Sequence, residues 1–161
     1  MPAALLLCLV IGISDGDTLT ARCDTSQGPQ NLRVRLAEID APEKAQPWGR
    51  RSKQHLAQLC FGRAAEVRER ETDRYGRSVA RVNCGGIDAN AEQVRAGMAW
   101  VYERYTKDRR LFVEQDAARA SRRGLWADNA PVAPWDWRSQ RRPTPAGRRE
   151  TFDSRTLQRA H

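Results

Sequence analysis

Alternating hydrophobic and polar residues predict short strands in the first half of the chain. Five segments have this pattern and are bounded by turn residues: 8–14, 17–23, 32–36, 64–70 and 78–82. The first two flank Asp15-Gly16, a dipeptide typical of two-residue hairpin turns, and a polar loop is expected over residues 25–30. Five short strands that begin with a hairpin indicate a small closed or nearly closed barrel of the OB type, an architecture that binds oligonucleotides on one face.

Hydrophobic residues spaced three and four apart predict three helices, over residues 48–61, 89–97 and 109–123. A glycine stands at or just beyond the end of each: Gly62, Gly97 and Gly124. We therefore expect an α+β fold that is mainly β.

The ends of the chain differ from its centre, and we divide it into residues 1–7, 8–138 and 139–161. Residues 1–7 are nearly all apolar and could be the remnant of a signal segment, although the basic start and small-residue cleavage site of such segments are missing. Residues 139–161 are rich in arginine and poor in apolar residues, so we expect a disordered basic tail. The tail is either a nucleic-acid tether or an inert terminus.

The charge of the chain is a second indication of a nucleic-acid partner. The 161 residues carry 28 basic and 20 acidic side chains, a net charge of +8, and only three of the basic residues are lysines. Arginine binds phosphate through two parallel hydrogen bonds, so the composition favours a polyanionic partner such as nucleic acid. Arginine in place of lysine is also what a GC-rich genome produces without any functional reason. The 40% apolar content excludes a wholly disordered chain.

The four cysteines lack the close spacing of a zinc site. A turn at Asp15-Gly16 places Cys8 opposite Cys23, and a second bridge would join Cys60, at the end of a predicted helix, to Cys84, just after a predicted strand. Two disulfides would indicate a periplasmic or secreted protein. Four buried free thiols in a cytoplasmic protein are the alternative.

Three segments together contain the groups of a metal-assisted phosphodiesterase: 15–18, 35–43 and 72–77. Asp17 and Asp40 are hard oxygen donors suited to Ca²⁺ or Mg²⁺, and the backbone carbonyl of Ala41 could complete the set. Glu43 follows Asp40 across a proline-containing turn, where it could take a proton from an attacking water.

Arg35 and Arg77 come from separate predicted strands, and each can donate paired hydrogen bonds to phosphate oxygens. A straight strand would hold Arg35 and Asp40 about 17 Å apart. We therefore expect a sharp bend between Leu36 and Asp40.

In order and spacing, these segments resemble the thermonuclease family, the staphylococcal-nuclease-like domains. The resemblance covers residues 8–138. It rests on five segments: Ser14-Asp-Gly-Asp-Thr-Leu19, residues 35–43, residues 72–77, residues 90–99 and Gly124-Leu-Trp126. It implies an OB-type five-stranded barrel with three helices. It also implies a Ca²⁺-dependent nuclease that cuts DNA and RNA, endonucleolytically, and leaves 3′-phosphate ends.

The resemblance also implies a role for each site residue. Metal ligands would be Asp17, Asp40 and the carbonyl of Ala41, and the catalytic residues would be Arg35, Glu43 and Arg77. Asp15 would order metal-bound water, and Arg74 and Tyr75 would contact the nucleotide. Tyr105, like Tyr102, either stacks on a base or packs on the barrel.

Two functions of different class therefore stand: an active nuclease, and an inactive OB-type module that binds nucleic acid. The chain keeps all five charged residue types of the motif, at Asp17, Arg35, Asp40, Glu43 and Arg77, which favours the enzyme. The expected partners are DNA and RNA as substrates, with no membrane association and a monomeric chain.

Overall fold

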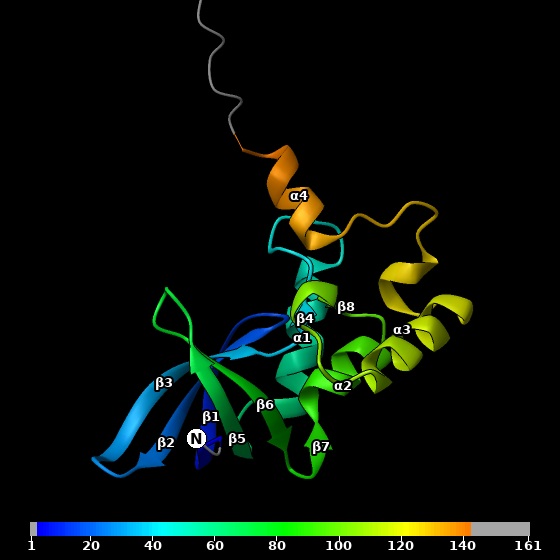
Figure 1. Cartoon of the computed structure of the whole chain (residues 1–161). Helices are drawn as coiled ribbons and strands as arrows, with labels where there is room; N and C mark the ends of the chain where they lie inside the picture. The colour runs from blue at the N-terminus through cyan, green and yellow to red at the C-terminus, as the bar shows by residue number, and fades with distance from the viewer. Residues whose placement is uncertain (1–2, 143–161) are drawn as a thin grey trace, which may run out of the picture.

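The computed structural model describes residues 3–142 (Figure 1). Its strands are β1 (Leu5–Asp15), β2 (Thr18–Thr25), β3 (Gly28–Leu36), β4 (Ile39–Asp40), β5 (Ala64–Thr72), β6 (Ser78–Cys84), β7 (Ile87–Asp88) and β8 (Trp100–Val101). Its helices are α1 (Gly49–Cys60), α2 (Ala89–Arg95), α3 (Arg110–Ala120), α4 (Pro134–Gln140) and the short 3₁₀ helices η1 (Glu103–Tyr105) and η2 (Gly124–Ala127).

Five strands close into the predicted OB-type barrel. They run in the order β3-β2-β1-β5-β6, and a parallel pairing of β3 with β6 closes the sheet, with Val34 opposite Ser78 and Leu36 opposite Ala80. The α+β class, mainly β, is confirmed. The structure adds a fourth α-helix, α4, to the three expected. It begins at Pro134, a residue type favoured in the first helical turn.

The first hairpin differs from its prediction in register. Its two-residue turn is Gly16-Asp17 rather than Asp15-Gly16, because Asp15 pairs with Thr18. Two register shifts within β1 then restore the predicted alignment, so that Cys8 does lie opposite Cys23. The shift has a consequence for the chemistry, since it places Asp17 in the turn itself.

Both predicted disulfides are present. Cys8–Cys23 joins β1 to β2, and Cys60–Cys84 joins the end of α1 to the end of β6. The second bridge fastens the helix that covers one end of the barrel to the strand that closes it.

The barrel interior contains the main hydrophobic core, and each flanking helix contributes one apolar side chain or more to it. The fully buried members include Val10, Leu19, Val34, Leu36, Val67 and Val82 from the strands and Leu56, Val94 and Leu111 from α1, α2 and α3. A smaller cluster of Ala118, Leu125 and Trp126 lies beneath α3.

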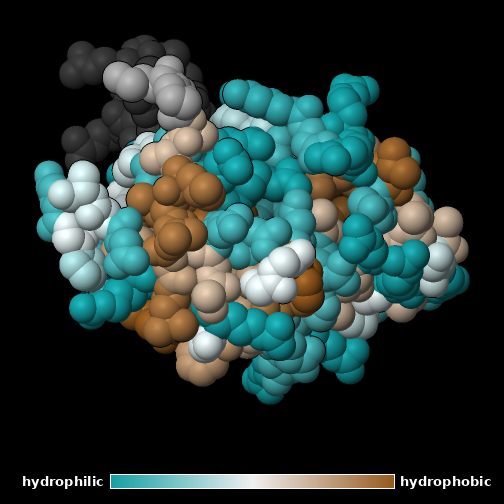
Figure 2. All heavy atoms as spheres, turned by 90° about the horizontal axis from the view of Figure 1, so that it is seen from below, coloured by the Kyte–Doolittle hydropathy of each residue, from teal (hydrophilic) through white to brown (hydrophobic). Residues whose placement is uncertain are grey.

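The outer surface of the barrel is mixed. Figure 2 shows hydrophobic groups gathered in patches between hydrophilic ones on the lower face. The exposed large apolar side chains of β1 alternate along the strand and are Leu5, Leu7, Leu9 and Ile11. Among the described residues, no helix has the length and apolar character needed to cross a bilayer.

The two ends of the chain, which differ in sequence from its centre, are described only in part. β1 begins at Leu5, so the apolar start of the chain runs directly into the barrel. At the other end, α4 continues to Gln140. The disordered tail predicted over residues 139–161 therefore starts too early, because Ser139 and Gln140 belong to α4. Residues 143–161 of that prediction lie outside the described residues.

Candidate active site

Two buried aspartates from separate segments meet at one end of the barrel. Asp17 lies in the turn between β1 and β2, and Asp40 ends the short strand β4. The backbone amide of Ala41 donates a hydrogen bond of 2.7 Å to Asp17 Oδ2, which ties the turn to the segment that follows β4. The exposed fractions of Asp17 and Asp40 are only 6% and 2%.

Arg35 connects the two carboxylates. Its Nη2 atom lies 3.5 Å from Asp17 Oδ2 and 3.5 Å from Asp40 Oδ1. The chain reaches this arrangement through the expected bend after β3, where Glu38 adopts a left-handed conformation with φ of 70°. The bend therefore brings side chains five residues apart in the sequence to the same point.

Burial and neighbouring charges shift the pKa values of three carboxyl groups at this site. Burial, reinforced by the neighbouring charge of Asp17, raises the pKa of Asp15 to about 7. Burial likewise raises the pKa of Asp40. Burial would also raise the pKa of Asp17, but Arg35 and several hydrogen bonds outweigh that effect and lower it. The oxygens of Asp17 and Asp40 therefore form an acidic, partly desolvated pair that a hard divalent cation fits.

Glu43 joins the site through an arginine that sequence reasoning missed. Arg138, on α4, places Nη1 2.6 Å from Glu43 Oε1 and Nη2 2.7 Å from Asp40 Oδ2. The sequence placed Arg138 at the very edge of the expected domain and suggested no role for it. The signal that could have found it is Pro134, a typical helix start, followed by an aromatic residue and an arginine three positions apart.

Arg77 lies just before β6 and is held in a tight turn. Asp73 accepts hydrogen bonds from Arg77 Nε at 2.8 Å and from the Arg77 backbone amide at 3.0 Å. In the parallel pairing of β3 and β6, Arg35 is opposite Val79, two residues beyond Arg77. Arg77 therefore directly precedes the part of β6 that pairs with the Arg35 segment of β3. In the described structure its ion pair is to Asp73 and not to Asp17 or Asp40.

The predicted nucleotide-contacting residues occupy two exposed places. Arg74 Nη2 lies 2.7 Å from the Tyr75 hydroxyl in the turn between β5 and β6, and Tyr75 is 64% exposed. Tyr105 lies in η1, is 57% exposed, and packs against Tyr102 with ring centres 5.0 Å apart. Both tyrosines therefore present much of their rings to solvent.

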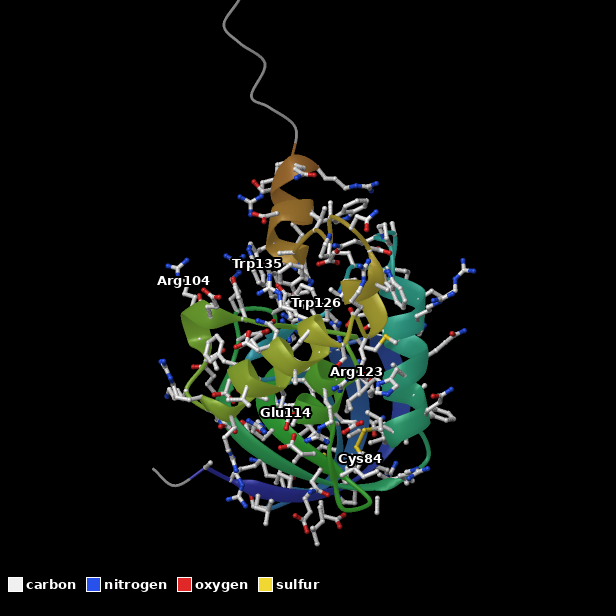
Figure 3. All side chains as sticks on the ribbon, turned by 90° about the vertical axis from the view of Figure 1, so that its right-hand side faces the viewer. Cys84, Arg104, Glu114, Arg123, Trp126 and Trp135 are labelled. Carbon is white, nitrogen blue, oxygen red and sulfur yellow. A yellow bond between two sulfur atoms is a disulfide. The ribbon has the colours of Figure 1, made fainter. Side chains whose placement is uncertain are left out.

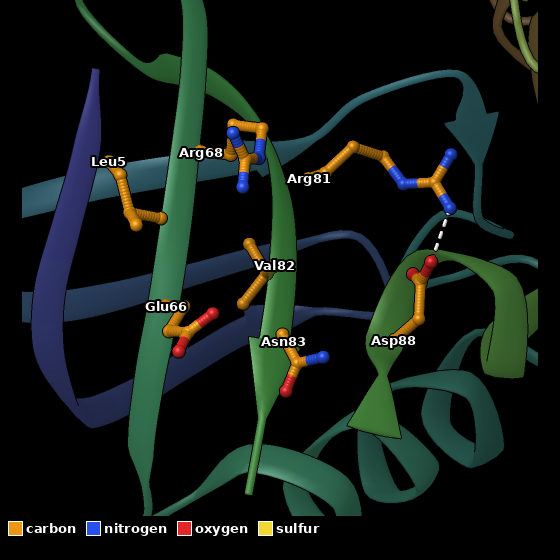
Figure 4. A pocket seen from close by; sticks show the side chains of 7 residues that line it. All are labelled: Leu5, Glu66, Arg68, Arg81, Val82, Asn83 and Asp88. Carbon is orange, nitrogen blue, oxygen red and sulfur yellow. Dashed lines mark hydrogen bonds and ion pairs between the residues drawn. The ribbon is translucent and has the colours of Figure 1, made fainter. Parts of the chain in front are cut away.

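A separate hollow of about 190 Å³ lies beside β5, β6 and β7 (Figure 4). None of the predicted site residues lines it. Of its two arginines, Arg68 and Arg81, the second points toward Asp88 and is ion-paired with it. This hollow is therefore distinct from the carboxylate site.

The described residues 3–142 contain no group of three or more His, Cys, Asp or Glu side chains arranged to hold a metal ion by themselves. Asp17 and Asp40 supply two carboxylates, and any further ligand must come from the backbone or from solvent. A two-carboxylate site of this kind is compatible with hard cations, which retain water or carbonyl ligands.

Known proteins provide an independent comparison. Residues 33–128 match a family model described as staphylococcal nuclease homologue. A protein of Haemophilus influenzae named uncharacterized endonuclease is 42% identical over 147 residues, which cover 91% of this chain and 81% of that protein. A micrococcal nuclease of Shigella flexneri is 42% identical over 140 residues, covering 80% of this chain and 78% of that protein.

A plant protein extends the likeness beyond bacteria. A staphylococcal-like nuclease of Arabidopsis thaliana is 35% identical over 113 residues, which cover 70% of this chain and 35% of that protein. The matched family model spans more than half of the chain, and the segment that it covers carries Arg35, Asp40, Glu43 and Arg77. On these grounds the chain belongs to the staphylococcal nuclease homologue family.

Proposed function

We propose that this protein is a calcium-dependent nuclease that hydrolyses phosphodiester bonds of DNA and RNA, cuts within the chain and leaves 3′-phosphate ends. The observation that carries the proposal is the convergence of Asp17 and Asp40 on the guanidinium of Arg35, at 3.5 Å from each. The relatives named endonuclease and micrococcal nuclease support the same class of reaction.

The proposed cofactor is Ca²⁺, held by Asp17, Asp40 and the backbone carbonyl of Ala41. These oxygen donors suit a hard cation, and both carboxylates are buried at one place. When bound, the ion would supply positive charge to the phosphate oxygens of the substrate. Asp15, beside Asp17, would orient water at this site.

The chain's own residues perform the remaining steps. Arg35 and Arg77 donate hydrogen bonds to the non-bridging phosphate oxygens and stabilise the charge that grows on them. Glu43 accepts a proton from the attacking water, whose oxygen bonds to phosphorus as the bond from phosphorus to the 5′ oxygen breaks. The 5′ oxygen takes a proton from solvent water as it leaves and becomes a hydroxyl group, and the phosphate remains on the 3′ side.

Binding of the substrate chain would fall to exposed residues. Arg74 would contact the phosphate backbone, while Tyr75 and Tyr105 have exposed rings on which bases can stack. Stacking of this kind is tolerant of sequence, which suits a nuclease of broad substrate range.

Cleavage of plasmid DNA, denatured DNA and RNA during a calcium titration tests the proposal. We expect cleavage to require Ca²⁺, to stop with a chelator, and to fall by about three orders of magnitude or more in Asp40→Asn. The matched control is Asp116→Asn, the same chemical change at an exposed position on α3, which should cleave like the wild type. Analysis of the product ends checks for 3′-phosphates.

The same assays also test the alternative function, an inactive module that binds nucleic acid. A chain that binds nucleic acid with a salt-dependent affinity, but cleaves no substrate at any calcium concentration, would be an inactive binding module. Unchanged cleavage in Asp40→Asn would contradict the metal assignment itself.

We also propose that the protein acts as a monomer in the periplasm or outside the cell. Both disulfides are of the kind that persists in oxidising compartments. Light scattering should give a mass near 18.2 kDa. Mass spectrometry of protein from a periplasmic fraction, without reduction, should find all four cysteines bridged, and free thiols would contradict the location.

A further inference from the structure

Helix α4 lies over the carboxylate site and is anchored there by an aromatic contact. Trp135 stacks on Tyr102, with ring centres 5.3 Å apart and an interplanar angle of 15°, and meets Trp100 edge-on. Figure 3 shows Trp135 at the end of α4 that faces the barrel, above Trp126. Trp135 and Arg138 are three residues apart and therefore share one face of the helix. The packing of Trp135 thus determines where Arg138 points.

Arg138 occupies the oxygens on which the proposed metal site depends. Its two terminal nitrogens lie 3.2 Å from Asp40 Oδ1 and 2.7 Å from Asp40 Oδ2, and the first also lies 2.6 Å from Glu43 Oε1. The Asp40 side chain is 2% exposed, whereas the side chains of Arg138 and Glu43 are each 40% exposed. A guanidinium reaching in from the solvent side therefore covers a buried carboxylate.

We propose that Arg138 is an internal competitor of the divalent cation: α4 holds its guanidinium on Asp40 and Glu43 until the cation displaces it. The inference rests on the proposed function, because it names the same cation as the competing ligand. It assigns to Arg138 the control of metal affinity at this site.

Arg138 and a divalent cation compete for the same oxygen atoms. Arg138 contacts both carboxylate oxygens of Asp40, whereas Arg35 contacts only one of them, at 3.5 Å. A cation bound to Asp40 would also repel the guanidinium, because like charges a few ångströms apart repel each other. The apparent dissociation constant of the cation is then the intrinsic one divided by the fraction of molecules in which Arg138 has left. An Arg138 contact formed in about nine molecules of ten weakens the apparent affinity about tenfold.

Calcium titration of the full chain by isothermal titration calorimetry measures this competition. The test variant is Arg138→Gln. The control is Arg141→Gln, which makes the same charge change at the end of the same helix, where Arg141 lies 4.4 Å from the Trp137 ring centre. We expect Arg138→Gln to bind Ca²⁺ about tenfold more tightly, a gain of about 1.4 kcal/mol. The control should stay within about twofold of the wild type.

A second variant keeps the positive charge at position 138 but replaces the planar guanidinium, which can bind two carboxylates at once. Arg138→Lys carries a single ammonium that cannot bridge both oxygens of Asp40 and Glu43, so its calcium affinity should lie between those of the wild type and Arg138→Gln. Circular dichroism and thermal unfolding show whether each variant is folded. If Arg138→Gln fails to fold, the lysine variant decides the question.

The outcomes separate this inference from the proposed function. Equal or weaker calcium binding in Arg138→Gln and Arg138→Lys, with cleavage still dependent on Ca²⁺, would overturn the competition and leave the nuclease intact. Absence of calcium binding in all variants, with cleavage that persists in a chelator, would overturn both.

Discussion

Glu38 is a buried carboxylate that organises the bend leading to Asp40. Its Oε1 accepts hydrogen bonds from the backbone amides of Lys107 and Asp108 at 2.7 and 3.0 Å, and its Oε2 lies 2.9 Å from Arg81 Nη1. Burial alone would raise the pKa of Glu38, but these amides and the arginines hold it below its ordinary value. The Glu38 side chain thus connects the bend after β3 to the loop before α3.

Replacing Glu38 with glutamine should destabilise the protein in a way that depends on pH. We expect a loss of about 3 kcal/mol at pH 7, since arginines lose their buried partner. A lowered pKa means that the carboxylate stabilises the fold fully above its ordinary pKa of 4.5 and less as the pH falls below it. Urea unfolding with chelator should therefore show the gap between wild type and Glu38→Gln narrowing in acid.

The matched control is Glu103→Gln, the same change at an exposed position on η1. It should alter the free energy of unfolding by less than about 0.5 kcal/mol at any pH. A gap between wild type and Glu38→Gln that stays constant from pH 7 into acid would contradict the assigned role of the ionised carboxylate.

At the scale of elements, the segment that follows α2 passes very close to the start of η2, and this close approach involves Gly97. The carbonyl of Gly97, just after α2, accepts a 2.9 Å hydrogen bond from the amide of Leu125 in η2. A Cβ atom at Gly97 would lie 2.1 Å from the carbonyl oxygen of Arg123, and φ there is 69°. Glycine is required at this position both for its backbone conformation and for the close approach.

Gly97→Ala and Gly62→Ala separate these two requirements. Gly62 has a φ of 72°, but no atom lies within 4 Å of the place that an alanine methyl group would take, so it carries only the conformational requirement. We expect Gly62→Ala to lose about 1 kcal/mol and Gly97→Ala to lose about 3 kcal/mol or more in urea unfolding. Equal losses would show that the close approach tolerates a side chain.

Alternating hydrophobic residues and turn residues predicted the strands correctly, because these signals are local in the sequence. The bend between Leu36 and Asp40 was predicted for another reason, namely that Arg35 and Asp40 must lie close together in the proposed site. The predicted position of the hairpin turn was wrong by one residue. The register shifts of β1 that cause this difference cannot be recognised from the hydrophobic pattern. Residues 28–30 were expected in a loop, yet they pair with β2, because a strand end tolerates a glycine and a proline.

Helix α4 was missed for a different reason. It has seven residues, and a helix this short is stabilised by what it packs against rather than by its own sequence. Its partners, Tyr102 and Asp40, are distant in the chain and come together only in the folded barrel. The sequence therefore signals the start of the helix at Pro134, but not the contacts of Arg138 with Asp40 and Glu43.

At the scale of the molecule, the two disulfides fasten β1 to β2 and α1 to β6. Their cysteines are 15 and 24 residues apart. Loop-closure entropy predicts that Cys8→Ala with Cys23→Ala costs about 3 kcal/mol, and that Cys60→Ala with Cys84→Ala costs about 3.5 kcal/mol. Urea unfolding of each double variant measures these losses, and values within about 1 kcal/mol of wild type would contradict the prediction.

The parallel pairing of β3 with β6 joins the two strands at opposite ends of the five-strand order. Of the two proposed phosphate-binding arginines, Arg35 lies within this pairing and Arg77 directly precedes it. Contacts between remote parts of a chain form late in folding, after the local hairpins. Under the proposed function, an unfinished molecule would hold Arg35 without its counterpart Arg77. Under that proposal, hydrolytic competence would arise only after β3 and β6 have paired, as a late step of folding.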